Sequence, residues 1–577
     1  MKRIQLTAPI ENLWQLLTET SEDANRIVCV FNSSKLHGII TDSEIRKFVA
    51  LNRKLPTELS QILRTDFIHV TNEIDSLQMA ESIAGQLEKK NYSMPNAINE
   101  VLVVSEEKVN LVPLSEFQND INICRDRFVV IGLGYVGLTL FAVLFSKISH
   151  KRVFGVESDQ LKLEKLIKKD FYILEPGLRD RLEDLNQANL FKSLSEIRLN
   201  RDGSIGKSIY FVSVQTPVSP DGSTSLEAIL SVANDISKNL QRGDVVIIRS
   251  TVPIGTSRWV AKKIENLTNL KCGIDFYLGF APERTVEGDA IKEIEGLPQI
   301  ISGYSNSCVV KIREVVQRWT VSIAAASSLE AAEMIKLSNN AYRDHHFAFA
   351  NELSMIANTH NVDINEVIAL ANSGYLRSNI PLPSAGVGGP CLSKDSKILL
   401  SEKITEETQA RVCLDSGMFE LSTILSARLV NEQMPAYFAE LISSELTPTS
   451  VGVILGMTFK GSPPTNDLRN SPSVQLFNEL VKKGACLYCW DSDVSGEELS
   501  ELGYRSFQGS LIDEKTFPSF SIIGNNHNQN VIELKRLSEK YRSIKMVFDP
   551  WDLIRTQGEI SFFRSKKIEV RTLSTLL

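Results

Sequence analysis

The sequence is poor in cysteine. Only eight of its 577 residues are cysteine, and they are spread along the whole chain. They stand at positions 29, 124, 272, 308, 391, 413, 486 and 489. Secreted domains that depend on disulfides are small and much denser in cysteine. We therefore expect reduced thiols and a cytoplasmic location.

The sequence also lacks an excess of positive charge. Lysine and arginine number 63 against 70 aspartate and glutamate residues, which gives a formal net charge of −7, and no long basic run is present. Because nucleic-acid binding requires a concentrated positive surface, nucleic acid is not expected as a partner.

Long hydrophobic runs are scarce as well. The first residues, MKRIQLTAPIENLWQLL, contain no apolar stretch that ends in a small-residue cleavage site, so they do not predict a signal peptide. One run, residues 128–145, is about 18 residues long, which is near the lower bound for a membrane span. Three glycines spaced for a turn interrupt it. This spacing favours a strand, a turn and a helix, and no membrane partner is expected.

What the chain does have is length for several domains. At roughly 100–200 residues per domain, it predicts three or four. Between residues 127 and 297, apolar runs alternate with helical patterns; the runs are RFVVIGLG, KRVFGVES, SIYFVSVQ, DVVIIRST and DFYLGFAP. Buried parallel strands have this pattern. We predict a Rossmann-like, doubly wound α/β domain over residues 126–325.

Helical periodicity replaces the alternation over residues 326–447, with one stretch near 327–370 and a second at 406–446. Apolar runs return in SVGVILGMTF, GACLYCWD, FSIIGN and KMVFDP, which predicts a smaller Rossmann-like domain over 448–577. The predicted fold class is α/β, with two Rossmann-like doubly wound domains joined by a helical central domain.

Residues 1–120 follow another pattern. Segments 26–50 and 97–117 each read as strand, polar turn, strand and helix. Two copies of one weak pattern suggest an internal α+β pair. The polar segment EFQND at 116–120 marks the predicted boundary with the next domain.

A glycine motif follows the first strand of the Rossmann-like domain. Gly132, Gly134 and Gly137 in GLGYVG allow backbone amides and a helix N-terminus to meet a pyrophosphate. Glu157 follows the next strand, where an acid can bond a ribose 2′-hydroxyl and repel a 2′-phosphate. The motif in this context predicts dinucleotide binding, with NAD favoured over NADP.

A second glycine-rich segment, GVGGPCLSKD at 386–395, presents Cys391 three residues before Lys394. A thiol next to a cation in flexible backbone is how a nucleophilic cysteine is exposed and its thiolate stabilised. A single loop cysteine is more often inert, so this segment alone leaves both interpretations open.

Seven motifs in order resemble the UDP-sugar 6-dehydrogenases over roughly residues 127–555. They are GLGYVGL at 132–138, TP at 216–217 with Asp221 and Gly222, RSTVPIGT at 249–256, APERTVEG at 281–288, Lys336 with Asn340, GVGGPCLSKD, and GMTFKGSPPTNDLRNSP at 456–472. The resemblance implies oxidation of the C6 alcohol of a UDP-hexose to a carboxylate. It implies two NAD per sugar, a cysteine thiohemiacetal and a thioester, in synthesis of a surface polysaccharide.

The resemblance also assigns catalytic roles. It makes Cys391 the nucleophile, and Lys336 and Asn340, four apart on one predicted helix face, the groups that stabilise oxyanions. It gives Glu283 and Asp395 acid–base roles around the hydrolytic water, and it places Thr251 near the nicotinamide.

Binding residues follow from the same resemblance. The predicted cofactor contacts are Gly132, Gly134, Tyr135, Val136, Gly137, Glu157, Lys162, Thr216, Thr251, Lys394 and Arg469. The predicted substrate contacts are Glu283, Arg284, Lys336, Arg377, Gly386 and Lys460. Relatives dimerise through their long central helices, so at least a homodimer is expected.

The sugar stays open. The family's ribose acid is commonly Asp, whereas this chain has Glu157. GGPCLSKD looks closer to the UDP-glucose branch, because relatives that act on N-acetylated sugars often carry GGHC. PERTVEG, AYRDHHFAFANE at 341–352 and YLRSNIPLP at 375–383 look more like the N-acetylhexosamine branch. We lean to UDP-N-acetylhexosamine, with UDP-glucose as the alternative.

Several other residues have plainer interpretations. Cys486 and Cys489 have CxxC spacing, but no second pair or nearby histidine completes a zinc site, so no metal is expected. His345 and His346 are expected to line the pocket or lie on the helix surface. The apolar stripe at 418–429 is expected to be core or dimer contact.

The N-terminal pair has a resemblance of its own. GIITDSEIRKF at 38–48 resembles the end of a cystathionine β-synthase (CBS) motif, in which Thr41 and Glu44 would meet the ribose or phosphate of an adenosine ligand. The second copy is degraded and offers Ser115 and Glu116. An adenine nucleotide is therefore a candidate ligand of a CBS pair over residues 1–120.

Other classes of function fit less well. A non-catalytic nucleotide sensor would not need the set of Cys391, Lys336, Asn340, Glu283 and Asp395. A 3-hydroxyacyl or 6-phosphogluconate-type dehydrogenase would share the Rossmann and helical parts. It would need neither the cysteine segment nor a third, UDP-holding domain.

Overall fold

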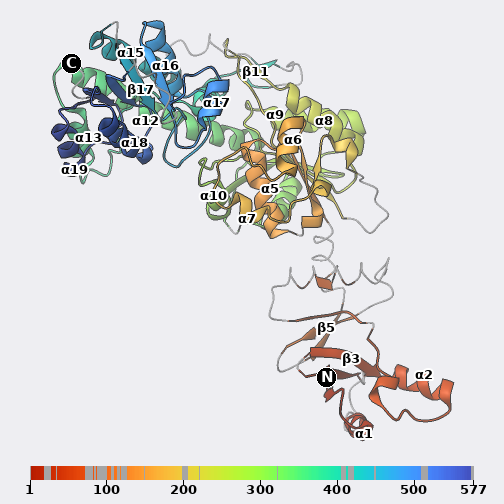
Figure 1. Cartoon of the computed structure of the whole chain (residues 1–577). Coiled ribbons are helices and arrows are strands. Elements are labelled where there is room, and N and C mark those ends of the chain that lie inside the picture. Colours follow the sequence, from red (N-terminus) through yellow and green to blue (C-terminus); the bar gives the residue numbers. More distant parts are fainter. Residues whose placement is uncertain are drawn as a thin grey trace. The chain divides into compact units, whose positions relative to one another are not determined.

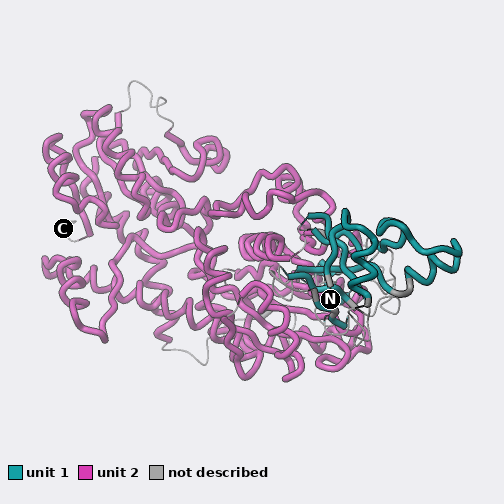
Figure 2. Tube along the Cα trace, turned by 90° about the horizontal axis from the view of Figure 1, so that it is seen from below, with its two compact units in different colours: residues 1–127, 199–207 teal, residues 128–198, 208–577 magenta. Residues whose placement is uncertain are grey.

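The computed structural model divides the chain into two compact units. One consists of residues 1–127 with 199–207, the other of 128–198 with 208–577 (Figures 1 and 2). The structure describes all residues except 1, 19–26, 34, 66, 72–78, 80–81, 84–85, 87–99, 106–108, 114–116, 118–125, 149, 198–205, 220, 321, 405–410, 413–421, 448–449, 508–516 and 574–577.

The first unit contains two three-stranded sheets of the same construction. In each, the first strand runs parallel to the second and the second antiparallel to the third. The elements are β1 (Lys2–Gln5), α1 (Ile10–Thr18), β2 (Ile27–Asn32), β3 (Lys35–Thr41), α2 (Asp42–Asn52), β4 (His69–Thr71), β5 (Glu100–Val104) and β6 (Val109–Pro113). Phe31 and Ile39 of one sheet pack with Leu102 of the other.

The repeated strand pair that the sequence predicted is confirmed in β2–β3 and β5–β6, and so is the helix after β3. The parallel strands β1 and β4 that begin each copy were not predicted. The expected second helix, with Ser115 and Glu116, and most of the segment 116–120 lie outside the described residues.

The second unit begins with an eight-stranded sheet. Its first six strands in sequence are parallel and lie in the spatial order β9-β8-β7-β10-β12-β13, which is the Rossmann order 3-2-1-4-5-6. The strands are β7 (Arg127–Ile131), β8 (Val153–Val156), β9 (Leu190–Phe191), β10 (Ser208–Val212), β12 (Val245–Ile248), β13 (Tyr277–Phe280), β14 (Gln299–Gly303) and β15 (Ile323–Ala325).

Helices cover this sheet. They are α5 (Tyr135–Lys147), α6 (Gln160–Ile167), α7 (Leu178–Arg181), α8 (Glu227–Asn239), α9 (Thr256–Thr268), α10 (Ala290–Gly296) and α11 (Asn306–Val316). Residues 128–145 form β7, the glycine turn and most of α5, as predicted. In the described part of the chain, no helix has both the length and the apolar character that crossing a membrane requires.

The middle of the second unit is helical. It comprises α12 (Leu329–Thr359), α13 (Ile364–Asn372), α14 (Gly389–Leu399) and α15 (Thr423–Ser444). The Ser328 hydroxyl accepts from the Ala331 N–H and begins α12, which packs against α14 and α15. The prediction of a second helical stretch from residue 406 was wrong at its start. Arg411 and Val412 form β16, which pairs with β11 (Thr224–Ser225).

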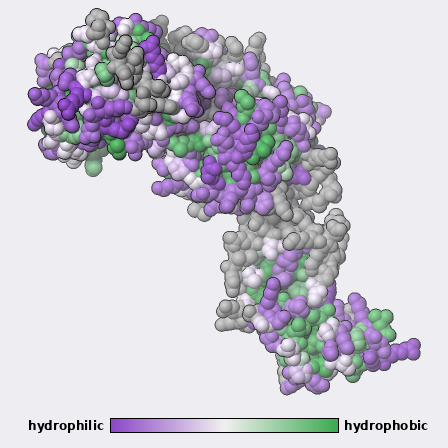
Figure 3. All heavy atoms as spheres, in the orientation of Figure 1, coloured by the Kyte–Doolittle hydropathy of each residue, from purple (hydrophilic) through white to green (hydrophobic). Residues whose placement is uncertain are grey.

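The last domain is a five-stranded parallel sheet in the order β18-β17-β19-β20-β21. Its elements are β17 (Val451–Leu455), α16 (Pro472–Lys482), β18 (Cys486–Trp490), α17 (Gly496–Glu501), β19 (Phe520–Ile523), α18 (Asn528–Lys540), β20 (Met546–Asp549), α19 (Gln557–Ser565) and β21 (Glu569–Thr572). One apolar core joins this sheet to α15 and α16, and a second lies under α18 and α19. Hydrophilic residues predominate on the face shown in Figure 3.

Candidate active site

The glycine turn after β7 leaves room for a ligand. Gly132 has φ +84°, a left-handed conformation that favours glycine, and a Cβ on Gly137 would lie 1.8 Å from the Gly132 carbonyl oxygen. A Cβ on Gly134 would meet no atom within 4 Å. Tyr135 and Val136 form the first turn of α5. The turn therefore presents an open surface at a helix N-terminus, which suits a pyrophosphate.

Glu157 lies directly beside this turn. Its buried carboxylate accepts hydrogen bonds from the N–H of Leu133 at 3.0 Å and of Asp159 at 3.0 Å. Lys162 stands on α6, with Nζ 4.0 Å from Asp159 and 5.9 Å from the centre of the Tyr172 ring. The glycine turn, Glu157 and Lys162 thus lie near the carboxyl ends of β7 and β8.

Three predicted cofactor residues meet where the sheet faces α14. The Thr216 hydroxyl donates to the Thr251 carbonyl at 2.6 Å, and Lys394 Nζ donates to the Thr216 carbonyl at 3.4 Å. Thr216 follows β10, Thr251 follows β12 and Lys394 belongs to α14. Ligands of open α/β sheets bind outside the carboxyl ends of the strands, and the cysteine helix meets the sheet at this end.

Cys391 stands in the first turn of α14, so the glycine-rich segment becomes helical two residues before it. Its surface is exposed to solvent, while the protein atoms packed around the thiol desolvate it and raise its pKa. The charge of the Lys336 ammonium lowers the pKa of this thiol, whereas the charge of Asp395 raises it further. The thiol is therefore mainly protonated at neutral pH, and its reaction needs a base.

Lys336, Asn340 and Asp395 form a cluster beside this thiol. The Asn340 amide donates to Asp395 Oδ2 at 2.6 Å, and Lys336 Nζ lies 3.9 Å from the same oxygen. All three side chains are buried, and Asp395 Oδ1 has no hydrogen-bond partner. An unpaired buried carboxylate oxygen fits a water or a substrate hydroxyl.

Glu283 is already engaged by the protein. Its carboxylate accepts a hydrogen bond from the fully buried Arg249 and further bonds from the N–H groups of Arg284 and Thr285, at 2.9 and 3.0 Å. A carboxylate with three donors holds local structure more readily than it moves protons. The prediction of an acid–base role for Glu283 gains no support from these contacts.

Glu287 was missed by the sequence reasoning, although it is the second glutamate of the quoted PERTVEG motif. Burial, followed by the charge of Asp467, raises the pKa of its carboxyl to about 7. Thr465 donates to this carboxylate at 3.1 Å, and Lys460 Nζ donates to the Glu287 main-chain carbonyl. Glu287 also contributes to the raised pKa of Cys391, so the two groups influence each other.

The remaining predicted residues divide into two groups. Lys460 donates to the Glu287 main-chain carbonyl, and burial lowers its pKa. Arg469 lies near Glu287 and donates to Asp467 at 2.9 Å. Gly386 has φ +126°, and its backbone lies close to Pro435. Arg284 instead donates to the Pro298 carbonyl at 2.5 Å, and Arg377 donates to the Tyr375 hydroxyl at 3.1 Å. The structure does not bring these two arginines to the cysteine.

Buried polar contacts hold the cysteine segment in place. Arg428 of α15 pairs with Asp344 of α12 at 2.7 Å and donates to the carbonyls of Val387 and Leu392 at 2.7 and 3.3 Å. Glu333, one turn before Lys336, accepts from the N–H groups at the start of α9, and burial raises its pKa to about 7. These contacts join α12 both to the cysteine helix and to the Thr251 loop.

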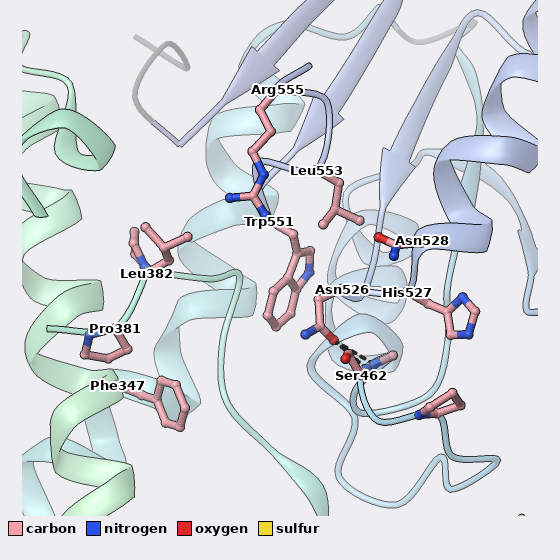
Figure 4. Close-up of a pocket in the computed structure, with 13 residues that line it drawn as sticks. Phe347, Pro381, Leu382, Ser462, Asn526, His527, Asn528, Trp551, Leu553 and Arg555 are labelled. Atoms are coloured by element: carbon pink, nitrogen blue, oxygen red, sulfur yellow. Dashed lines mark hydrogen bonds between the residues drawn. The ribbon is translucent and has the colours of Figure 1, made fainter. Parts of the chain in front are cut away.

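A cavity of about 570 Å³ lies between the central helices and the last domain (Figure 4). Phe347 of α12 lines it, two turns beyond Asn340, together with Pro381 and Leu382. Trp551 and Arg555 line the opposite side, and the Trp551 Nε1–H is fixed by the Gly524 carbonyl at 2.8 Å. Its aromatic and cationic lining suits a flat ring with an anionic group.

The residues given plainer interpretations lie as follows. Cys489 is buried in β18, and among the described residues no group of three or more His, Cys, Asp or Glu side chains is arranged to hold a metal. His345 is exposed, and the His346 ring packs at a tilt against Tyr342 with ring centres 4.0 Å apart. Leu429 is exposed on α15, and residues 418–421 lie outside the described part.

A Rossmann sheet with an open glycine turn, joined to a helix that carries a cysteine at its start, defines an NAD-dependent dehydrogenase with a candidate cysteine nucleophile. Two family models match the chain: the NAD-binding domain of the UDP-glucose/GDP-mannose dehydrogenase family at residues 126–320 and its central domain at 330–416. Neither extends over residues 1–125.

Similar proteins agree with this assignment. A Pyrococcus horikoshii UDP-N-acetyl-D-mannosamine dehydrogenase is 32% identical over 363 residues, which are 62% of this chain and 81% of the relative. A Campylobacter jejuni protein of the same name is 29% identical over 370 residues, 62% of this chain and 84% of the relative.

Solved structures point the same way. The P. horikoshii UDP-D-ManNAc dehydrogenase structure is 26% identical, with a TM-score of 0.61 over 78% of this chain and 99% of that chain. Cap5O of Staphylococcus aureus is 25% identical, with a TM-score of 0.60 over 78% of this chain and 98% of its own. The protein belongs to the UDP-glucose/GDP-mannose dehydrogenase family and is an NAD-dependent oxidoreductase.

Proposed function

We propose that the protein oxidises the C6 alcohol of a UDP-N-acetylhexosamine to the carboxylate, with two NAD reduced per sugar. The observation that carries this proposal is the cluster of Lys336, Asn340 and Asp395 beside Cys391, on a helix that meets the Thr216–Thr251 end of the sheet. The names of the relatives, UDP-N-acetyl-D-mannosamine dehydrogenases, support the N-acetylated sugar. UDP-glucose is the alternative.

The residues of the glycine turn fit NAD. Gly134 leaves open space at the N-terminus of α5, and Glu157 provides an acid for the ribose. Bound there, NAD supplies the hydride acceptor for both oxidations. The need for NAD and for a reduced Cys391 favours a cytoplasmic site for the reaction.

The chain's own groups can carry the covalent steps. Loss of a hydride and a proton converts the C6 alcohol to an aldehyde, and the Cys391 sulfur adds to its carbon after losing the thiol proton. Lys336 and Asn340 stabilise the negative oxygen that results. Loss of a second hydride leaves a thioester, and retention on sulfur prevents escape of the aldehyde.

Hydrolysis completes the balance. A water attacks the thioester carbon, the C–S bond breaks, and the thiol and the carboxylate are released. Each turnover consumes one water and two NAD and yields two NADH and three protons. Asp395 Oδ1, which is buried without a partner, fits a hydrogen bond to this water. Glu287, with its pKa near 7, fits the base that removes the water's proton.

The nucleotide end of the substrate fits the cavity beyond Asn340. Phe347 and Trp551 offer apolar ring surfaces to a uracil, and Arg555 offers a positive charge. Lys460 directly precedes Gly461, which lines this cavity, and its ammonium suits the diphosphate. A site that extends along one face of α12 can thus hold both ends of a UDP-sugar.

The test is NADH formation by the full chain with UDP-glucose, UDP-N-acetylglucosamine and UDP-N-acetylmannosamine in parallel. We expect two NADH per sugar consumed, with an N-acetylated sugar preferred, and no complete turnover by Cys391→Ser. One NADH per sugar from the wild-type protein would contradict the thioester mechanism. Sugar binding without any NADH would instead support a non-catalytic sensor.

We also propose that the chain forms a homodimer or a higher homo-oligomer through α12. An exposed apolar stripe follows this helix at intervals of seven or eight residues: Met334 at 51% exposure, Tyr342 at 63%, Phe349 at 48% and Ile356 at 50%. Apolar side chains at this spacing lie along one side of a helix and are typical of a contact between helices.

For residues 1–120 we propose a CBS-type pair. Two sheets with the same strand order support the internal repeat. Thr41 ends β3 and its hydroxyl donates to Glu44, so the two residues that the resemblance selects lie together. An adenine nucleotide is the proposed ligand at Thr41 and Glu44.

A further inference from the structure

Residues 171–175, between α6 and α7, lie against both the glycine turn and the last domain. Among the described residues, no main-chain N–H of 171–175 donates to a main-chain carbonyl. Side-chain contacts with other segments therefore hold this segment in position.

On the cofactor side, two bonds join the segment to the glycine turn. The Tyr172 hydroxyl donates to the carbonyl of Leu133, the residue between Gly132 and Gly134. The Tyr135 hydroxyl, at the start of α5, donates to the buried carboxylate of Glu175. The segment thus contacts the glycine turn that is predicted to hold a pyrophosphate.

On the substrate side, the amide side chain of Asn466 makes the first connection. Asn466 Nδ2 donates to the Tyr172 carbonyl at 3.2 Å, and Asn466 Oδ1 accepts from the Leu174 N–H at 3.3 Å. Asn466 follows Lys460 in the GMTFKGSPPTND motif of the last domain. Residues 171–175 are therefore hydrogen-bonded both to the glycine turn and to the last domain.

A second connection runs through Glu175. Its carboxylate accepts from the N–H of Gly288 at 2.9 Å and of Ile291 at 3.1 Å. A Cβ on Gly288 would lie 2.7 Å from Pro463, so the main chain of Gly288 packs closely on the last domain. The residue before it is Glu287, which is bonded to Lys460 and Thr465.

We propose that Tyr172 and Asn466 are positioning residues that couple NAD binding to UDP-sugar binding, so that each ligand tightens the binding of the other. The proposal rests on the proposed function, because it takes residues 460–467 as part of the substrate site. A pyrophosphate on the glycine turn fixes the acceptor of Tyr172, and Tyr172 and Leu174 fix Asn466. The ligand that binds second then finds this segment already ordered.

The coupling can be measured on the full chain without turnover. NADH affinity is determined by its fluorescence, with and without saturating UDP, and UDP affinity with and without NADH. Linkage requires the two ratios to be equal. We expect the wild-type ratio to be at least about fivefold, and Tyr172→Phe and Asn466→Ala each to lower it below about twofold. A purely structural role would weaken both affinities and leave the ratio unchanged.

Tyr504→Phe is the matched control, because it removes the same hydroxyl from a ring that packs on Phe477 at 5.4 Å in the core of the last domain. This variant should keep the wild-type ratio. A wild-type ratio of one, or an unchanged ratio in both Tyr172→Phe and Asn466→Ala, would overturn the coupling alone. Failure of the wild-type protein to bind UDP at all would overturn the proposed function and the coupling with it.

Discussion

Two titratable groups control the proposed reaction, the thiol of Cys391 and the carboxyl of Glu287. Protein atoms are packed around the thiol and the carboxyl, and this burial raises the pKa of each group. Glu287 rises from 4.5 to about 7, whereas Cys391 rises from a value that is already 9.0. The Glu287 carboxyl therefore loses its proton at a lower pH than the Cys391 thiol, and each should leave its own limb in a pH profile.

The first prediction concerns Glu287→Gln. A base must be deprotonated to act, so kcat of the wild-type protein should rise with pH through about 7 and fall about tenfold for each unit below it. Glu287→Gln should lose this limb and lower kcat by about 10²- to 10⁴-fold. Because hydrolysis is the step affected, intact-protein mass spectrometry should detect an acyl group on Cys391.

Asp289→Asn provides the control for charge. This substitution removes one negative charge from an exposed side chain that lies two residues after Glu287. The pH profile of the variant should keep its limb near pH 7. If Glu287→Gln retains this limb and shows no acyl-enzyme, Glu287 is not the base. The lysine, arginine and aspartate that face Glu287, at 460, 469 and 467, remain in every variant.

Individual residues differ in how far the sequence reveals them. The order of motifs was enough to select Cys391, Lys336, Asn340 and Asp395, and the structure brings these four together. It did not select Glu287, because what sets this residue apart is its burial against Thr465 and Asp467, almost 180 positions further along the chain. Spacing within a motif carries no information about such distant contacts.

Secondary-structure elements also differ in how far the sequence reveals them. The strands with four or five consecutive apolar residues, such as β7 and β12, were predicted, because full burial leaves a continuous run in the sequence. The two-residue strands β9 and β16 were not, since so short a pairing has no period. The first turn of α14 contains a glycine and a proline, and its N-cap is Gly388; these residues resemble a loop until tertiary contacts hold them in a helix.

The exposed stripe on α12 leads to the second prediction. Burying the exposed half of four such side chains would contribute about 3–6 kcal/mol per protomer. We expect the full chain to be at least a dimer in sedimentation equilibrium, and Phe349→Glu to shift it toward the monomer. The substitution should change the stability of the monomer by no more than about 0.5 kcal/mol, because the side chain is already half exposed.

Ile532→Glu is the matched control for this helix. It places the same charge on an exposed apolar position of α18, outside the stripe, and should leave the oligomer intact. A wild-type monomer would contradict the proposal. An oligomer that withstands both Phe349→Glu and Tyr342→Glu would show that α12 is not its contact.

At the scale of the whole molecule, the chain divides into a part that the chemistry needs and a part that it does not. The family matches begin at residue 126, and every group of the candidate site lies in the second unit. The first unit has its own paired sheets and its own apolar core. Since no step of the proposed reaction draws on it, we infer that the first unit serves regulation.

The third prediction tests this inference with ATP and AMP on the full chain. A ligand at about one hundred times its Kd stabilises the unit that binds it by about 2.7 kcal/mol. For a unit of this size, that stabilisation raises Tm by about 10 °C. We expect one of the two nucleotides to give this shift in calorimetry, Thr41→Ala to abolish it, and kcat to respond to the nucleotide only when Thr41 is present.

Thr57→Ala, the same change at an exposed position of the same unit, should retain both effects. If neither nucleotide shifts Tm of the wild-type protein, or if Thr41→Ala responds as the wild type does, the first unit does not sense an adenine nucleotide at Thr41.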